Sequence, residues 1–394
     1  MSRDLYGRDE DGSLNMPEQL RVGVIGASWY SDLRHLPALK SHPRAQTVAI
    51  CDIDRDRAEE MARKYDIRLV SSDYRQVIDK GNLDALLVVT PDDTHHAITM
   101  DALDAGLHVL CEKPLAYNAQ QAREMYDKAE AAGVKHMTFF TFRWVPHYRY
   151  LKELVDEGYI GRCFDCHITL LTGGGRGGGY SWRYDRKHGN GVLSEYGAHM
   201  IDLTRWLVGD IATVSAHLHM HLDRPGAGGG VLDPTNDSAM LAIGFVNGAQ
   251  GVMQLSALAY IGTRGMDQRI TLHGESGTLE ARATFRGAEI RGARATGAGE
   301  LEAWDTFASA ELSGGRDGEE EFHLLPIPDR IRAGLDEANP YHIISQFRGD
   351  YLFIDSILED RPISPSFYDG LKAQEVIDAA KESHKTGRWI SLQS

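Results

Sequence analysis

Short apolar runs alternate with amphipathic segments over the first third of the chain. Apolar runs that predict strands lie in RVGVIGAS (21–28), TVAICDID (47–54), ALLVVTPDD (85–93) and HVLCEKP (108–114). Apolar residues at helical spacing predict helices over 32–42, 55–67 and 97–106. Strands that alternate with helices form a parallel sheet covered on both faces, so this region predicts a doubly wound α/β domain.

The second half of the chain has a different pattern. Two regions, 238–260 and 268–285, read as strands joined by glycine-containing turns. A closing helix is predicted over 367–388, with Gly387 as its stop signal. At 394 residues the chain is too long for one ordinary domain. We expect a flexible leader over 1–19, a first domain over 20–142 and a second domain over 143–394.

Composition narrows the class of protein. The hydrophobic content of 42% and the charged content of 25% are typical of a soluble globular protein. The net charge of −15 argues against a nucleic-acid partner, because it leaves no basic face for phosphates. No stretch approaches the roughly 20 apolar residues of a membrane span, and the polar N-terminus lacks the apolar region of a signal peptide. We therefore expect a cytoplasmic protein.

The four cysteines do not predict a metal site. Cys51 and Cys111 lie in apolar strand patterns, which is typical of reduced, buried thiols. Cys163 and Cys166 form a CxxC motif, but a second pair and a nearby histidine cluster are missing from the sequence. Side chains three residues apart on a strand also point to opposite faces. We expect no bound metal.

The turn after the first predicted strand carries the first candidate chemistry. Gly26 is present, but Ser28 and Ser31 stand at the second and third glycine positions of the G-x-G-x-x-G pattern. Glycine there lets the backbone approach a pyrophosphate, next to the amide donors of a helix N-terminus. Asp52 ends the second strand, where an acidic residue accepts hydrogen bonds from a ribose. This predicts dinucleotide binding; Asp52 favours NAD, and the nearby Arg55 leaves NADP open.

The segment LHVLCEKPLA (107–116) places Glu112 and Lys113 directly after an apolar strand. A buried ammonium is costly unless it is paired or used. The residues alone leave two interpretations open, a solvated ion pair in a surface turn and a catalytic lysine. Pro114 indicates a rigid turn, which a cis peptide bond would suit.

The segment GVLSEYGAHMIDLTRWLVG (191–209) predicts a helix with Ser194 as its N-cap and Gly209 just beyond its C-cap. Glu195, His199 and Asp202 lie at i, i+4 and i+7 and form one polar stripe on an otherwise apolar helix. One interpretation is a solvated face or a core histidine satisfied by its neighbours. The other is a catalytic histidine oriented by a carboxylate.

A glycine-rich segment precedes this helix. Every residue from 173 to 179 is glycine except Arg176, which predicts a loop without fixed structure, either an exposed connection or a lid over a ligand. Aromatic and charged side chains nearby suit sugar binding and simple packing equally. These candidates are Tyr180, Trp182, Arg183 and Tyr184 after the loop and Arg143, Trp144 and Tyr148 before it. Trp29 and Tyr30 follow the turn at Gly26, where they would border the cofactor or the substrate, or simply pack.

On several separate segments the chain resembles the Gfo/Idh/MocA family of oxidoreductases, which includes glucose-fructose oxidoreductase and inositol dehydrogenases. These segments are GVIGAS followed by HLPAL, CDIDRDRA, TPDDTHHAITMDALDAGLHVLCEKPLA, FRWVPHYRYLKELVDEGYIGR and GNGVLSEYGAHMIDLTRWLVG, within a resemblance that runs from Arg21 to Leu392. The resemblance implies an N-terminal Rossmann domain and a C-terminal α/β domain with a large, mostly antiparallel sheet. It also implies that the sheet's open face packs on a second subunit, in a homodimer or homotetramer.

The resemblance further implies roles for single residues. The family's E-K-P lysine, which sits beside the nicotinamide and the reacting carbon, corresponds to Lys113. Its proton-accepting histidine and orienting carboxylate correspond to His199 and Glu195, although the family usually has aspartate at the latter position; Asp202 is a candidate second partner. Cofactor contacts are expected from Gly26, Ala27, Ser28, Trp29, Tyr30, Asp52, Ile53, Thr90, Pro91, His95, Glu112 and Lys113. Substrate contacts are expected from Arg143, Tyr180, Trp182, Arg183, Glu195 and His199.

The expected reaction is hydride transfer between NAD, with NADP possible, and a secondary alcohol or ketone of a sugar, glycoside or cyclitol. Lys113 would stabilise the developing alkoxide, and the chemistry requires no metal. Three alternatives stay open: a non-catalytic NAD-binding sensor, a glycoside-processing enzyme with tightly bound NAD, and a reductase of a non-sugar carbonyl. The presence of both Lys113 and His199 argues against the sensor.

Overall fold

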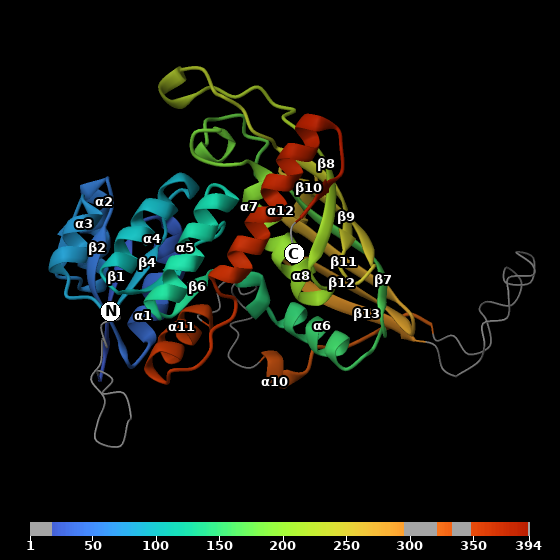
Figure 1. The fold of residues 1–394 in the computed structure, drawn as a ribbon, viewed down its shortest axis with the longest axis horizontal. Coiled ribbons are helices and arrows are strands. Elements are labelled where there is room, and N and C mark those ends of the chain that lie inside the picture. Colours follow the sequence, from blue (N-terminus) through green and yellow to red (C-terminus); the bar gives the residue numbers. More distant parts are fainter. Residues whose placement is uncertain (1–17, 295–320, 333–347, 393–394) are drawn as a thin grey trace, which may run out of the picture.

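Two β-sheets organise the computed structural model, which describes residues 18–294, 321–332 and 348–392; the predicted leader lies almost entirely outside them. Six strands form one sheet in the order β3-β2-β1-β4-β5-β6, and nine form the other in the order β14-β13-β12-β11-β7-β10-β9-β8-β15. Figure 1 shows the smaller sheet with its helices at the left and the larger sheet at the right.

The smaller sheet is the predicted doubly wound α/β fold. Its strands are β1 (Leu20–Ile25), β2 (Ala45–Cys51), β3 (Leu69–Ser71), β4 (Ala85–Val88), β5 (His108–Cys111) and β6 (His136–Thr138). Its helices are α1 (Leu36–Ser41), α2 (Arg55–Tyr65), α3 (Tyr74–Lys80), α4 (His95–Asp104) and α5 (Ala119–Ala132). All its strand pairs are parallel, and β4 and β5 are buried throughout, as helices on both faces require. A π-helical turn, Ser31–His35, precedes α1 where one helix was predicted.

The larger sheet confirms the expected mostly antiparallel architecture, since β7 and β10 form the one parallel pair among its described strands. Its strands are β7 (Cys163–Thr172), β8 (Ile211–His219), β9 (Ser238–Phe245), β10 (Gln250–Ser256), β11 (Met266–Gly274), β12 (Gly277–Thr284), β13 (Gly287–Arg294), β14 (His323–Leu324) and β15 (Ile390–Ser391). The remaining helices are α6 (Pro146–Asp156), α7 (Val192–Glu195), α8 (Gly197–Leu207), α10 (Asp329–Arg332), α11 (Arg348–Leu358) and α12 (Phe367–Thr386).

The two faces of the larger sheet differ. In β9 and β10 alternate residues such as Leu241 and Met253 are buried, and these pack into the core beneath α6, α8 and α12. Met240 and Val252 point to the other face and are half exposed. Figure 1 shows the helices on the side towards the smaller sheet, while no described helix covers the opposite face.

The C-terminal part of the chain returns to the first domain. Phe353 of α11 joins Leu20 and Val22 of β1 in one core cluster, and Phe367 at the start of α12 joins another core of the same domain. The predicted single boundary after residue 142 therefore misses a segment, because α11 completes the first domain from the far end of the chain. The closing helix α12 ends as predicted at Gly387, which has a φ of 66°.

The predicted helix over 194–209 is broken. Helix α7 ends at Glu195 and α8 begins two residues later, so Ser194 lies inside α7 rather than at its N-cap. The side chain of Asn236 caps α7 instead, because its oxygen accepts the N–H of Leu193 at 3.0 Å. Gly209, with a φ of 132°, follows the end of α8 as predicted.

The first half of the glycine-rich segment is held firmly, which corrects the prediction of a loop without fixed structure. The N–H of Gly175 donates to the carbonyl oxygen of Ala257 at 2.9 Å, and the guanidinium of Arg224 donates to the carbonyl of Gly175. A Cβ on Gly175 would lie 2.7 Å from the hydroxyl of Tyr184. Glycine at this position therefore permits close packing.

Candidate active site

The turn after β1 packs so closely against the chain at Val89 that there is no room for a side chain at Gly26. Gly26 has a φ of 106°, which favours glycine, and a Cβ there would lie 2.1 Å from the carbonyl oxygen of Val89. Asp52, just after β2, supports this turn: its Oδ2 accepts the N–H of Ala27 at 2.8 Å. The hydroxyl of Ser31 donates to the carbonyl oxygen of Gly26 at 2.5 Å. The serine that replaces a motif glycine thus stabilises the turn.

These residues fit a dinucleotide. The turn lies at the carboxyl edge of a parallel sheet, where open α/β sheets bind their ligands. Two apolar side chains beside it are unusually exposed, Trp29 at 65% and Ile53 at 94%. The Gly26 turn would suit a pyrophosphate, and the Asp52 carboxylate would suit a ribose. The exposed side chains of Trp29 and Ile53 would suit a flat base.

His95 joins two backbone turns at this edge without reaching its surface. It is fully buried, with its Nδ1 2.8 Å from the carbonyl oxygen of Pro114 and its Nε2 2.8 Å from that of Thr90. It therefore ties the turn after β4, which contains Thr90 and Pro91, to the turn after β5. The predicted cofactor contact of His95 is thus replaced by a positioning one. The Lys113–Pro114 peptide bond is cis, in agreement with the sequence.

Glu112 is also used inside the protein. Its carboxylate lies 3.2 Å from Nε2 of His35 and accepts the backbone N–H of Lys113 at 3.1 Å. Only 7% of the residue is exposed, so the expected cofactor contact is not available to this carboxylate. Tyr30 packs edge-on against the His35 ring with centroids 5.7 Å apart, and burial raises the pKa of its phenol.

Lys113 and Glu195 meet across the two domains. Nζ of Lys113 lies 3.3 Å from Oε2 of Glu195 and donates to its backbone carbonyl oxygen at 3.3 Å. Nε of Arg183 lies 3.1 Å from the same Oε2. Burial would raise the pKa of this carboxyl, but the Lys113 ammonium and the Arg183 guanidinium lower it to about 2. The Glu195 carboxylate therefore pairs with two cations at the carboxyl end of β5.

His199 lies on α8 beside this cluster. Its ring stacks on Phe142 with centroids 4.4 Å apart and planes 24° apart, and Phe140 meets it edge-on. Its Nδ1 is buried and has no hydrogen-bond partner. Burial, followed by the charge of Lys113, lowers the pKa of His199 well below its usual value. The imidazole is therefore neutral at neutral pH, so one of its two ring nitrogens is unprotonated.

The predicted orientation of His199 by Glu195 is wrong in its geometry. Glu195 ends α7, on the other side of the helix break from His199, and two cations occupy its carboxylate. Stacking on Phe142 fixes the imidazole plane instead. The role that the structure supports for Glu195 is to hold Lys113 and Arg183.

Asp92 belongs to the cluster, although the sequence analysis missed it. It lies in the turn after β4, is 4% exposed, and its Oδ2 accepts the hydroxyl of Ser194 at 3.1 Å. Burial raises the pKa of Asp92 to about 7, even though the charge of Lys113 opposes the shift. The doubled aspartate of TPDD was a visible signal, but the sequence could not show which carboxyl is buried.

Asp92→Asn is expected to change how stability depends on pH. A carboxyl with a raised folded-state pKa binds its proton more tightly in the folded protein, so its contribution to stability falls as the pH rises from about 4 through about 7. Asparagine keeps an acceptor for Ser194 without the charge. The unfolding temperature of the variant relative to the wild type should therefore rise between about pH 5 and about pH 8. Parallel pH profiles would contradict this.

Arg143, a predicted substrate residue, is locked in the interior. It is 7% exposed, and its Nε and Nη2 donate to Asp202 at 2.8 and 2.5 Å. It also donates to Asp369 at 2.8 Å and to Ser364 at 3.1 Å. The Nε, Nη1 and Nη2 atoms of Arg143 all donate to these partners, which joins α8 to the start of α12. The prediction of a substrate contact is therefore wrong. Asp202, the third member of the polar stripe, is its structural partner.

The aromatic candidates fall into three groups. The guanidinium of Arg183 lies 4.6 Å from the ring centroid of Trp182, so this pair borders the cluster. Tyr180 is 40% exposed, and no described contact joins it to the cluster. Trp144 and Tyr148 are 4% and 1% exposed and belong to the core, which corrects the prediction that they line the cleft.

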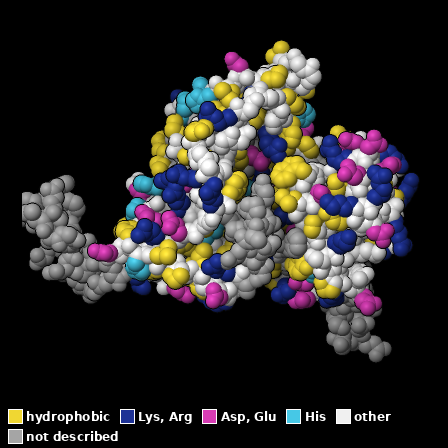
Figure 2. Space-filling model, turned by 180° about the vertical axis from the view of Figure 1, so that it is seen from behind, with side chains coloured by type: hydrophobic (Ala, Val, Ile, Leu, Met, Phe, Trp, Pro, Cys, Tyr) yellow, Lys and Arg dark blue, Asp and Glu magenta, His cyan; other side chains and the backbone are white. Residues whose placement is uncertain are grey.

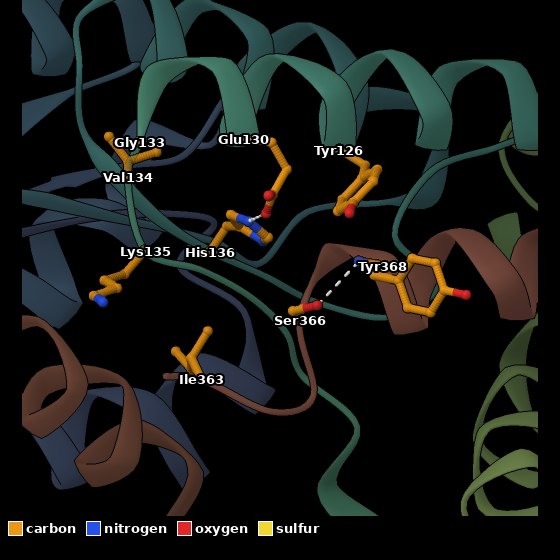
Figure 3. Close-up of a pocket in the computed structure, with 9 residues that line it drawn as sticks. All are labelled: Tyr126, Glu130, Gly133, Val134, Lys135, His136, Ile363, Ser366 and Tyr368. Carbon is orange, nitrogen blue, oxygen red and sulfur yellow. Dashed lines mark hydrogen bonds and ion pairs between the residues drawn. The ribbon is translucent and has the colours of Figure 1, made fainter. Parts of the chain in front are cut away.

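A surface cavity of about 280 Å³ lies away from this cluster. Figure 3 shows its lining: Tyr126, Glu130, Gly133, Val134, Lys135, His136, Ile363, Ser366 and Tyr368. It opens at the amino end of β6, the opposite edge of the sheet from the Gly26 turn. Within the described parts of the chain, no group of three or more His, Cys, Asp or Glu side chains could hold a metal ion, and no helix is long and apolar enough to cross a membrane.

Comparison with known proteins gives matches over both domains. A model of the GFO/IDH/MocA oxidoreductase family with an NAD-binding Rossmann fold matches residues 20–140, and a GFO/IDH/MocA C-terminal domain model matches 148–280. Levoglucosan dehydrogenase of Pseudarthrobacter phenanthrenivorans is 28% identical, over 95% of this chain and 98% of that protein. Myo-inositol 2-dehydrogenase of Thermotoga maritima is 31% identical, over 66% of this chain and 75% of that protein.

A solved structure extends the likeness to three dimensions. Levoglucosan dehydrogenase in complex with NADH and levoglucosan has a TM-score of 0.79 and is 26% identical to this chain. The match covers 95% of this chain and all of the other. The arrangement of the two sheets is therefore shared over the whole length of that protein.

Proposed function

This chain belongs to the GFO/IDH/MocA family of oxidoreductases, and from that membership we propose that it oxidises a secondary hydroxyl of a sugar, glycoside or cyclitol with NAD, or catalyses the reverse reaction. One observation carries the proposal: the Lys113 ammonium and the neutral His199 lie in one cluster next to the carboxyl edge of the NAD-binding domain. The relatives above are named as dehydrogenases of levoglucosan and myo-inositol, which supports a polyhydroxylated ring as substrate.

Each side chain of the cluster has its own role in the proposed reaction. Lys113 donates a hydrogen bond to the reacting oxygen and stabilises its developing negative charge. An unprotonated ring nitrogen of His199 accepts the hydroxyl proton. Glu195 holds the Lys113 ammonium in place, and Arg183 shares that carboxylate. A bound nicotinamide would supply the hydride acceptor for the carbon that carries the reacting hydroxyl. In the reverse direction His199 returns the proton to the oxygen.

Gly26, Asp52, Trp29 and Ile53 would hold the cofactor. Asp52→Asn tests the preference for NAD, because asparagine keeps an acceptor for the Ala27 N–H but removes the charge that repels a 2′-phosphate. The ratio of kcat/KM for NADP to that for NAD is expected to rise about tenfold, which corresponds to about 1.4 kcal/mol. Steady-state rates with both cofactors measure the ratio. An unchanged ratio would remove Asp52 as the selecting residue.

The open face of the larger sheet supports a homo-oligomer, a homodimer or homotetramer, as part of the same proposal. Met240 and Val252 are half exposed on it, at diagonal positions of the neighbouring strands β9 and β10. A large sheet with one uncovered face gains stability by burying such side chains against a second copy. Light scattering on the purified protein measures the mass; the mass of one chain would contradict the proposal.

A small-molecule substrate and a cytoplasmic location complete the proposal. Figure 2 shows Lys and Arg side chains interspersed with Asp and Glu on the face in view, without a basic stripe for nucleic acid. The four cysteines are free thiols, which suits a reducing compartment.

A substrate panel tests the function. The purified protein is given NAD, and separately NADP, with cyclitols, aldoses and glucosides, and the absorbance of reduced nicotinamide is followed. We expect a rise with one class of ring polyol. If the absorbance does not rise and the purified sample already contains bound cofactor, the glycoside-processing alternative is favoured. If the absorbance does not rise and the sample contains no bound cofactor, the sensor is favoured.

A further inference from the structure

His35 is clamped between two carboxylates from distant parts of the chain. Its Nδ1 lies 2.6 Å from Oδ1 of Asp350, on α11, and its Nε2 lies 3.2 Å from Oε1 of Glu112. All three side chains are at most 9% exposed. Because both ring nitrogens face carboxylates, both hold protons, and the group is a buried imidazolium with two counter-ions. Burial lowers the pKa of His35, but the two carboxylates, Asp350 first, raise it to about 9.

The clamp continues to the active site. The second oxygen of Glu112, Oε2, accepts the backbone N–H of Lys113 at 3.1 Å. The side chain of Lys113 then ends on Glu195. A series of direct contacts therefore runs from α11, near the C-terminus, to the backbone of the proposed catalytic lysine.

Without the imidazolium, the Glu112 carboxylate would lose its counter-ion. Aromatic rings of Tyr30 and Phe139 pack around His35, at 5.7 and 4.6 Å between centroids. A buried carboxylate that loses its cation is costly, so Glu112 would turn away from its present position. That movement weakens the hydrogen bond from the Lys113 N–H.

We propose that His35 is a positioning residue for Lys113, acting through Glu112 and anchored by Asp350. The proposal rests on the role of Lys113 in the proposed function, but the contact itself does not. The competing explanation is that His35 only fastens α11 to the first domain.

The chain offers a matched control for that explanation. His42 also comes from the region of α1, is buried, and lies 3.2 Å from Oδ1 of Asp355 on the same helix α11. No described contact joins it to Glu112. His42→Gln therefore weakens the docking of α11 without touching the Lys113 segment, whereas His35→Gln does both.

Hydrogen exchange of the full-length protein, read by mass spectrometry on peptides that span Lys113, tests the proposal without any substrate. Residue 114 is proline and has no amide, so peptides that end at residues 112 and 114 differ by the Lys113 amide alone. We expect His35→Gln and Asp350→Asn to speed exchange at Lys113 about tenfold or more, and His42→Gln to leave it unchanged. Equal exchange in the His35 and His42 variants would overturn the proposal. Asp350→Asn keeps the test intact if His35→Gln does not fold.

Turnover gives the second readout. With a substrate identified, His35→Gln should lower kcat about ten- to a hundredfold, because small displacements of a catalytic group cost that much, while KM for NAD changes little. His42→Gln should leave kcat within about twofold of wild type. Equal kcat losses in both variants would reduce His35 to a structural role. Altered exchange at Lys113 in a protein whose Lys113→Ala variant still turns over would uphold the positioning and reject the proposed function.

Discussion

Replacement of His199 by alanine is expected to lower kcat by about 10²- to 10⁴-fold, the range that a lost general base costs, and Lys113→Ala should do the same through the lost alkoxide stabilisation. Neither side chain supports the Gly26 turn or the Asp52 carboxylate, so affinity for NAD should stay within about twofold. Initial rates of NADH formation and calorimetric titration with NAD measure the two quantities.

Two variants serve as controls for these losses. His96→Ala removes the neighbour of His95, a partly exposed histidine paired with Glu124 at 2.8 Å. Lys135→Ala removes a lysine of the same domain that pairs with Asp360 at 2.8 Å, far from β5's carboxyl end. Both should keep wild-type turnover. If His199→Ala kept it too, His199 would no longer stand as the base.

Arg143→Met is expected to destabilise the protein by about 3–5 kcal/mol, the usual result of breaking a buried ion pair from one side. Methionine fills much of the volume but leaves Asp202 without the cation that it pairs with, and Asp369 with only Arg205, at 3.8 Å. Burial already raises the pKa of Asp202 to about 6 while the guanidinium opposes that shift, so loss of Arg143 raises it further. Denaturant unfolding gives the change in the free energy of unfolding.

Two comparisons check the cause of that loss. Arg330→Met removes an exposed arginine that pairs with Glu153 at 2.7 Å, and should cost far less, because exposed pairs contribute little. Arg143→Met combined with Asp202→Asn should recover part of the loss, since the stranded charge is gone. A double variant no more stable than Arg143→Met would place the damage in packing instead of charge.

The sequence predicted the elements whose pattern is local. The alternation of apolar strands and helices indicated the doubly wound sheet, and the Gly387 stop of α12 was visible as a left-handed C-cap. The break between α7 and α8 was hidden, because Asn236, more than forty positions away in the chain, caps α7 in place of Ser194. The return of α11 to the first domain is likewise a long-range packing choice that no local pattern encodes.

The candidate site shows the same division. Motif positions located Gly26, Asp52, Lys113 and His199, which the structure places at the sheet edge and in the adjoining cluster. Partner choice was not predictable: Glu195 pairs with two cations instead of the imidazole. Burial was not predictable either.

Three residues that were predicted to contact a ligand are buried in the structure. Arg143, His95 and Glu112 carry the polar groups that a binding site needs, and each satisfies a buried partner instead. A sequence records that a polar side chain is present, but its partner depends on the fold that closes around it.

Following the hydride itself is the most decisive experiment. A ring polyol that supports NAD reduction is supplied with deuterium on its carbinol carbons, and the reduced nicotinamide is analysed by mass spectrometry. If the Lys113 and His199 cluster oxidises a secondary alcohol with NAD, the reduced cofactor gains one deuterium from wild-type protein, and the His199→Ala variant forms almost none. Reduced cofactor without deuterium, or equal transfer by the variant, would contradict the proposed reaction.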